Sequence, residues 1–270
     1  MINVKRVLFQ PPPKRKSVTR NHELICNMES GIPFIQVGGD FNEKSTELVV
    51  KILYSHGNGE DLYMCKDYLE KMIEYLPKTI NDKKVGYIVW AWDYPSYGES
   101  KKSFDTLSEE TIKEDVYTIF ERFKETNFTP GNPECPSIVL TLGYSLGCFP
   151  SLYIAKECDI SGCIIMAPFQ NLKSVFPYFL KLFSGYLSSE KFSNDIYIRK
   201  ARCKVYTVQS ENDDVINYRD NYKAFKEYST NYLVIPLKKH KWFVSDEDGG
   251  ILLMAKKIEE LLNDVIEIKQ

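Results

Sequence analysis

The chain has 270 residues and a formal net charge of -2, and 43% of its residues are hydrophobic and 27% charged. This composition is that of a globular protein long enough to bury one large core, and a near-neutral charge gives no field that would attract nucleic acid. No apolar run reaches the ~18 residues of a transmembrane helix, and seven cysteines without C-x-x-C spacing argue against a disulfide framework or a metal site. We therefore expect a single cytoplasmic domain over residues 1–270, without a transmembrane segment, a metal or a nucleic-acid partner.

Residues 1–22 lack the long apolar core of a signal peptide. We expect them to form an extended lead-in to the domain. Residues 11–16 and Arg20 carry four cations, each of which would contribute about 1 kcal/mol at an anionic membrane. A solvated segment is the first expectation here, and peripheral membrane contact is the alternative.

Strand-like and helix-like patterns then alternate along the chain, which predicts an α/β fold with a mostly parallel central sheet and helices on both faces. Apolar residues recur at helical spacing between residues 64 and 76, between 112 and 123, and in a closing helix over 251–266. The expected strands are residues 32–37, 48–55, 85–92, 138–142, 163–167, 204–209 and 232–237.

The most informative stretch is Gly-Tyr-Ser-Leu-Gly at residues 143–147, which follows the apolar run 138–142 and precedes a helical pattern. Between a strand and a helix, the G-x-S-x-G pattern predicts a nucleophile elbow, in which glycines leave room for a strained turn that presents the serine hydroxyl above the sheet. Ser145 is therefore the candidate nucleophile, and a buried turn serine is the alternative.

A serine hydroxyl is a weak nucleophile near pH 7 and needs a base that is itself oriented by an acid. Hydrolases with this elbow carry the three residues in the order Ser, then Asp or Glu, then His. Only His240 of the three histidines follows Ser145, so His240 is the candidate base. A solvated histidine among the lysines at positions 238, 239 and 241 is the alternative.

The acid is expected on the loop after the strand at residues 204–209, where Glu211, Asp213 and Asp214 stand. Both Asp213 and Asp214 are candidates, because spacing read from sequence is uncertain by a residue or two.

The negative oxygen of a tetrahedral intermediate is usually stabilised by a pair of backbone N–H groups. One is expected from Leu146, which follows the nucleophile, and the other from Asn58 or Gly59 on the loop after the strand at 48–55. His56 precedes the nucleophile in the chain, so we expect it to order this loop by hydrogen bonds rather than to act as the base.

Four blocks of the sequence together resemble the α/β-hydrolases, and among them the group that includes the protein depalmitoylases called domain-containing protein 17. The blocks are residues 56–59, residues 93–100, residues 143–151 and the loops of Asp213 and His240, and they span about residues 48–245. The resemblance favours Asp213 as the acid. Two departures are that Ser96 stands where the group usually has glycine, and that the acylated cysteine cluster at the start of the depalmitoylases is missing, since the first cysteine is Cys26.

Hydrolases of this fold often carry a cap between the two strands that correspond to residues 163–167 and 204–209 here. The resemblance therefore implies a cap-like insertion over about residues 168–200. Phe176, Phe179 and Phe183 recur there at helical spacing. They are candidates for an acyl groove, and packed core residues are the alternative.

Together, these features predict a serine hydrolase that cleaves an ester or an acyl thioester through an acyl-enzyme, with no metal or organic cofactor. The resemblance implies long-chain acyl thioesters, with an acylated protein as a candidate substrate. A peptidase or a lipase on the same fold is the nearest alternative, because a fold does not fix its substrate. A catalytically silent binding module is the alternative from another class.

Overall fold

The structure is a computed structural model that describes residues 9–12, 26–175, 191–246 and 249–267. The predicted lead-in and the predicted cap therefore lie partly outside the described residues, and both remain predictions. Of the lead-in, the structure describes Phe9 to Pro12, and Phe9 is buried against Phe192, with 5.6 Å between the ring centroids.

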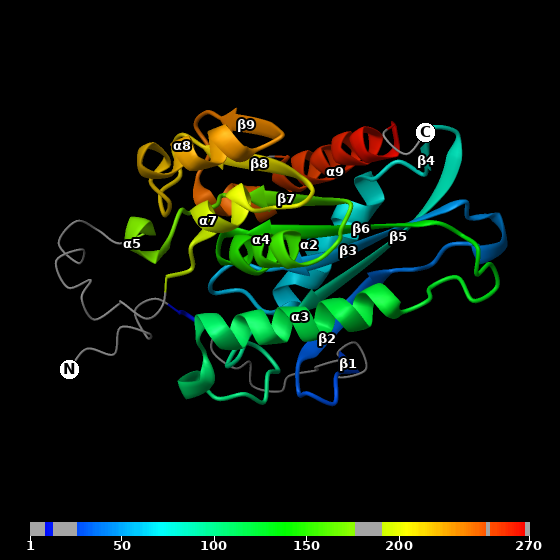
Figure 1. Cartoon of the computed structure of the whole chain (residues 1–270), viewed down its shortest axis with the longest axis horizontal. Helices are drawn as coiled ribbons and strands as arrows, with labels where there is room; N and C mark the ends of the chain where they lie inside the picture. The colour runs from blue at the N-terminus through cyan, green and yellow to red at the C-terminus, as the bar shows by residue number, and fades with distance from the viewer. Residues whose placement is uncertain (1–8, 13–25, 176–190, 247–248, 268–270) are drawn as a thin grey trace.

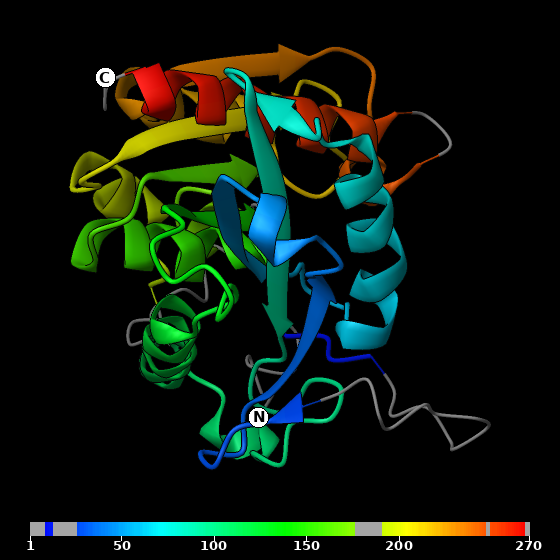
Figure 2. The same cartoon turned by 90° about the vertical axis from the view of Figure 1, so that its right-hand side faces the viewer.

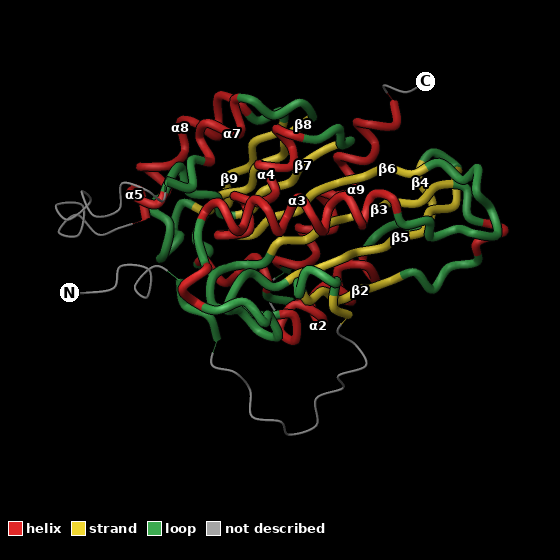
Figure 3. The backbone as a smooth tube through the Cα atoms, turned by 60° about the horizontal axis from the view of Figure 1, so that its bottom comes forward, coloured by secondary structure: helices red, strands yellow, loops and turns green. Residues whose placement is uncertain are grey.

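A twisted sheet forms the centre of the molecule, with the strand order β1-β2-β5-β3-β6-β7-β8-β9. Strands β5, β3, β6, β7, β8 and β9 run parallel to one another. Strand β2 pairs antiparallel with β5, and the edge strand β1 pairs antiparallel with β2. Figure 3 shows β2, β5, β3 and β6 side by side in this order. The strands are β1 (Cys26–Asn27), β2 (Pro33–Gly38), β3 (Leu48–Ser55), β5 (Lys83–Trp92), β6 (Ser137–Tyr144), β7 (Gly162–Met166), β8 (Lys204–Ser210) and β9 (Asn231–Ile235), and a short β4 (Thr79–Ile80) pairs with β5.

Helices cover both faces of this sheet (Figures 1 and 2). Helices α2 and α9 pack into one apolar core on one face, and α3, α4 and α7 contribute to a second core on the other. The predicted fold class, a mostly parallel sheet between two helical layers, is confirmed. The helices are α2 (Leu62–Tyr75), α3 (Glu109–Glu125), α4 (Cys148–Glu157), α5 (Leu172–Val175), α7 (Asn194–Arg199), α8 (Tyr218–Tyr228) and α9 (Gly250–Glu267).

The central strand β3 is buried along its whole length, as expected for a parallel strand covered on both faces. Its one charged residue, Lys51, donates hydrogen bonds from Nζ to the carbonyls of Lys124 (3.0 Å) and Thr126 (2.9 Å) at the end of α3. Burial lowers the pKa of Lys51. The cation is thus placed at a helix C-terminus, where unpaired carbonyls favour positive charge.

The loops that follow β3, β5, β6, β8 and β9 all leave the sheet at its carboxyl edge. In open α/β sheets this edge is where ligands bind, because the loops of adjacent parallel strands meet there. Helix α2 begins close to the same edge, and its first turn is fixed by the side chain of Asp61, which accepts a hydrogen bond from the N–H of Met64 at 3.0 Å.

Ser96, on the loop after β5, has a φ of +72°, which lies in the left-handed region that glycine adopts readily. Its N–H donates to the carbonyl of Lys102 at 2.9 Å, so this turn is held by the backbone. The chain thus keeps a glycine-like conformation at the position where the depalmitoylase group usually has glycine.

We predict that Ser96→Gly raises the free energy of unfolding by about 0.5–1 kcal/mol, because a non-glycine residue in the left-handed region costs roughly 1–2 kcal/mol and glycine recovers part of that. Urea denaturation measures the change. Ser103→Gly is the matched control, since Ser103 has a φ of -75° and its side chain makes no capping bond. The control should lose stability slightly. A loss of stability in Ser96→Gly as well would contradict the claim that the backbone of Ser96 is strained.

Candidate active site

Ser145 lies at the point where β6 ends and a 3-10 turn, η4 (Ser145–Gly147), leads into α4. Its φ is +53°, so the serine occupies the left-handed conformation of a strained turn. A Cβ atom on Gly143 would lie 2.3 Å from the carbonyl oxygen of Gly147, and one on Gly147 would lie 1.9 Å from the carbonyl oxygen of Ser55. Side chains at either position would collide with backbone, which explains why the pattern needs both glycines.

His240 follows the edge strand β9, and its side chain contacts Ser145, which follows the central strand β6. It begins η6 (His240–Val244), shortly after β9, and its Nε2 lies 2.8 Å from Ser145 Oγ. Its Nδ1 lies 2.7 Å from Asp213 Oδ2. Because a carboxylate only accepts, Nδ1 carries the hydrogen in this arrangement, and Nε2 of the neutral ring accepts from the serine hydroxyl. Ser145 is 6% exposed and His240 7%, so the pair is largely shielded from water.

The imidazole of His240 is also fixed from its own backbone. The hydroxyl of Tyr144 donates to the His240 carbonyl at 3.0 Å, and the two rings lie 5.2 Å apart. The His240 N–H donates to Asp214 Oδ1 at 3.0 Å. Tyr144 precedes the serine in the elbow, so the same turn presents Ser145 and anchors His240.

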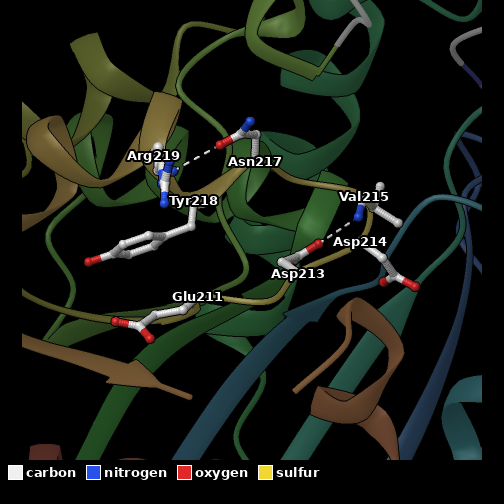
Figure 4. Close-up of a pocket in the computed structure, with 7 residues that line it drawn as sticks. All are labelled: Glu211, Asp213, Asp214, Val215, Asn217, Tyr218 and Arg219. Atoms are coloured by element: carbon white, nitrogen blue, oxygen red, sulfur yellow. Dashed lines mark hydrogen bonds between the residues drawn. The ribbon is translucent and has the colours of Figure 1, made fainter. Parts of the chain in front are cut away.

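The two aspartates of the acid loop do different things. Asp213 Oδ1 accepts hydrogen bonds from the N–H groups of Val215 (2.8 Å) and Ile216 (2.7 Å), which leaves Oδ2 for His240. Figure 4 shows this loop, with the bond from Val215 to Asp213 drawn as a dashed line. Asp214 accepts a hydrogen bond from the backbone N–H of His240 and not from its ring. This hydrogen bond holds the pKa of the Asp214 carboxyl below its usual range.

A surface pocket of about 460 Å³ lies beside the acid loop and the start of α8 (Figure 4). Asn217 caps that helix, since its side-chain oxygen accepts from the N–H of Arg219 at 2.9 Å. The residues that line this pocket include Asp213 and Asp214 but neither Ser145 nor His240. It therefore lies behind the acid rather than over the serine.

The loop predicted to carry the second oxyanion donor packs directly against the elbow. A Cβ atom on Gly57 would lie 2.7 Å from the ring of Tyr144, and Gly59 has a φ of +85°. The side-chain oxygen of Asn58 accepts from the N–H of Gln10 (2.9 Å) and from the hydroxyl of Tyr97 (2.6 Å). The side-chain oxygen of Asn58 is thus held by Gln10 and Tyr97, and the backbone N–H of Asn58 or Gly59 is the candidate donor. Leu146, the other predicted donor, is buried within the elbow.

Sequence reasoning did not identify Tyr144, Tyr97 or Gln10 as supports of this site. Tyr144 lies inside the five-residue pattern that was recognised, but the pattern itself leaves that position open. Gln10 belongs to the predicted lead-in, and no local pattern relates it to a loop 48 residues further on. Phe176, Phe179 and Phe183 lie outside the described residues, so the acyl groove remains a prediction.

Two further observations concern the described residues alone. No three side chains of His, Cys, Asp or Glu among them come together as a metal site would require. Within the same residues, no helix combines the length and apolarity needed to cross a bilayer.

Comparisons with known proteins give a clear result for the fold. No protein-family model matches the chain. An uncharacterized protein of Acanthamoeba polyphaga mimivirus is 25% identical over 201 residues, which are 68% of this chain. The matched part spans 63% of that viral protein's length.

Solved structures resemble the chain over most of its length. An esterase of Pyrococcus furiosus has a TM-score of 0.57 at 16% identity, covering 94% of this chain and 98% of the esterase. Mouse alpha/beta hydrolase domain-containing protein 10 has a TM-score of 0.58 at 14% identity, with 89% of this chain and 98% of the mouse chain covered. A monoacylglycerol lipase of Paleococcus ferrophilus has a TM-score of 0.58 at 16% identity, with 88% and 100% covered. At these identities the likeness concerns the fold, and the chain has the α/β-hydrolase fold.

Proposed function

We propose that this chain is a serine hydrolase that cleaves a carboxylic ester or an acyl thioester through an acyl-enzyme intermediate. The observation that carries the proposal is the hydrogen-bonded chain from Ser145 Oγ through the His240 ring to Asp213, with distances of 2.8 Å and 2.7 Å. A serine held in a left-handed turn, beside a buried histidine that is itself bonded to a carboxylate, is the arrangement that activates a hydroxyl for attack. The esterases and the lipase that share the fold support the same reading.

In the proposed reaction, Ser145 Oγ forms a bond to the carbonyl carbon while His240 Nε2 takes the hydroxyl proton. The tetrahedral intermediate then collapses, and the alcohol or thiol leaves with the proton that His240 returns. Water repeats the sequence on the acyl-enzyme and releases the carboxylic acid. Asp213 keeps the Nδ1–H tautomer and stabilises the imidazolium that forms at each step.

The negative charge on the carbonyl oxygen needs donors that are already in place. We assign these to the N–H of Leu146 and to the N–H of Asn58 or Gly59, whose loop packs against the elbow. Such donors contribute about 2.7–4 kcal/mol each to lowering the barrier in enzymes of this type. The chemistry requires no metal or organic cofactor.

The acyl thioester is the finer part of the proposal, and it rests on the resemblance to the depalmitoylase group. An acylated protein would then be the substrate, and Phe176, Phe179 and Phe183 would line the acyl chain. Peripheral contact with a membrane would suit such a substrate. Hydrolysis rates for p-nitrophenyl esters, acyl thioesters and aminoacyl amides rank these substrate classes, and a preference for amides would favour a peptidase instead.

The proposed proton relay predicts non-additive losses. Ser145→Ala and His240→Ala should each lower kcat by roughly 10⁴-fold or more, and the double variant should be scarcely worse than either, because residues that act as one unit fail together. Ester hydrolysis at saturating substrate measures the effect, and circular dichroism checks that each variant is folded. Activity of His240→Ala within tenfold of the parent would remove His240 from the mechanism.

The two aspartates give a second, matched prediction. Asp213→Asn should lower kcat by roughly 10²–10⁴-fold, since an amide can donate to Nδ1 and favour the wrong tautomer of His240. Asp214→Asn should cost less than about tenfold, because the amide oxygen can still accept the His240 N–H. The reverse order would reassign the acid to Asp214.

A further inference from the structure

A second acid–base cluster lies behind the loop that carries the proposed oxyanion donors. We call His56, Asp93 and Glu60 the His56 cluster, and their exposed fractions are 0%, 1% and 8%. None of the three contributes an atom to the proton relay of Ser145. Buried ionisable groups are costly unless they are paired, so their retention here calls for a physical reason.

The tautomer of His56 follows from its contacts. Its Nδ1 lies 2.8 Å from the carbonyl oxygen of Gly57, and because a carbonyl only accepts, Nδ1 must carry a hydrogen. Its Nε2 faces Asp93 Oδ1 at 3.5 Å, and no atom of the described residues makes a standard hydrogen bond with Nε2. A neutral ring would therefore direct a lone pair at a carboxylate oxygen in a site without exposed surface.

A proton on Nε2 removes that conflict. Asp93 accepts the N–H of Leu62 at Oδ1 (3.2 Å) and the N–H of Glu99 at Oδ2 (3.1 Å), contacts that suit an ionised carboxylate. Burial disfavours charge on His56, but the nearby negative charge of Asp93 and the Gly57 carbonyl outweigh it, so the pKa of His56 is raised. Burial also raises the pKa of the Asp93 carboxyl, against the lowering effect of His56. With the proton on the ring, the pair consists of an imidazolium and a carboxylate.

The same contacts hold the loop in place. Gly57 is bonded on both sides, since its carbonyl accepts from His56 and its N–H donates to Glu60 Oε2 at 2.6 Å. The carbonyl of His56 accepts from the hydroxyl of Tyr94 at 2.6 Å. Asp93 links this loop to the first residue of α2 through Leu62. The backbone before Asn58 is therefore held by Glu60, by Tyr94 and by the His56–Asp93 pair, and only the last of these contacts changes with the charge of His56.

We propose that His56 and Asp93 form a buried imidazolium–carboxylate pair that positions the oxyanion loop, and that loss of its proton limits the reaction on the alkaline side. His56 is in this view a positioning residue that acts through the loop, and the effect on the reaction rests on the proposed hydrolase function. The protonation of the pair itself does not depend on any activity.

Few other groups around His56 can titrate near neutral pH. The rings of Tyr94 and Tyr97 lie 4.3 Å and 5.6 Å from it, and burial raises the pKa of both phenols, so both stay neutral. Glu60 is the remaining charged neighbour. Burial raises the pKa of the Glu60 carboxyl above its usual value, although His56 and the N–H of Gly57 act to lower it.

The sign of the pH dependence follows from the raised pKa of His56. A base that binds its proton more tightly in the folded state stabilises the fold fully below its unfolded value of about 6.5, and this contribution is lost as pH rises through the folded value. The oxyanion loop should therefore be held at and below neutral pH and be released above the folded pKa.

The first test needs no substrate. Nitrogen NMR of the full chain, with His56→Asn used to assign the signals, should show hydrogens on both ring nitrogens of His56 at pH 7. In Asp93→Asn, where the opposite charge is gone, Nε2 should be unprotonated at the same pH. A parent protein with unprotonated Nε2 at pH 7 would overturn the proposal, whether or not the chain is a hydrolase.

The second test is the pH profile of kcat/KM for a p-nitrophenyl ester. Asp93→Asn should move the alkaline limb to lower pH by about one unit or more, since a lost counter-charge shifts a pKa by that much. His56→Ala should lower kcat by roughly tenfold to a hundredfold with little change in KM, because the oxyanion acts in the transition state. His56→Asn keeps an amide that can donate to the Gly57 carbonyl, so it should recover most of the kcat that His56→Ala loses. Because asparagine does not titrate, the alkaline limb of the kcat/KM profile should be absent in His56→Asn.

Lys51→Met is the matched control. It removes two partly buried hydrogen bonds from β3, the strand that precedes His56, so its stability should fall while its alkaline limb stays where the parent has it. An alkaline limb unmoved in both Asp93→Asn and His56→Asn would contradict the positioning role. Failure of the hydrolase proposal would look different, because the parent would then not hydrolyse the ester, or Ser145→Ala would hydrolyse it as fast as the parent.

Discussion

The left-handed turn at Ser145 is the constraint on which the rest of the site depends. It brings backbone so close to backbone that Gly147 leaves no space for a side chain beside the Ser55 carbonyl, and Gly143 none beside the Gly147 carbonyl. The elbow is thereby pressed onto the end of β3, where the loop of His56 to Gly59 begins. Tyr144, fixed by the same turn, packs on Gly57 and donates to the backbone of His240. A single tight turn thus sets the relative positions of Ser145, His240 and the loop that carries the proposed oxyanion donors.

Two buried histidine–aspartate pairs, His240–Asp213 and His56–Asp93, lie near this turn, and their contacts favour different protonation of the two rings. In the proposed reaction, His240 takes a proton from Ser145 through an Nε2 lone pair, and Asp213 orients the other ring nitrogen. His56 has Nε2 facing a carboxylate and is best satisfied as an imidazolium. Glu60 belongs to the His56 side of the turn, where it accepts from the N–H of Gly57. The proposed difference in protonation between His56 and His240 follows from their different contacts.

The sequence predicted those features that depend on local sterics and on chain order. The elbow could be recognised because only glycines fit around Ser145, and His240 because no other histidine follows it. The choice between Asp213 and Asp214 depends on which carboxylate accepts from Val215 and Ile216, a matter of side-chain direction that spacing does not encode. Helix α8 was not predicted, since its sequence is polar overall and only Asn221, Ala224 and Phe225 of it are buried. The contact of Gln10 with Asn58 joins distant segments and has no local signature.

The central claim, that Ser145 is an activated nucleophile, is tested most directly by mapping a covalent adduct. The full chain would be treated with a fluorophosphonate, digested with protease, and its peptides analysed by mass spectrometry. We predict one phosphonyl group per chain, located on Ser145, and its absence when His240 is replaced by alanine. A folded protein that remains unlabelled, or one that is labelled at another residue, would contradict the account.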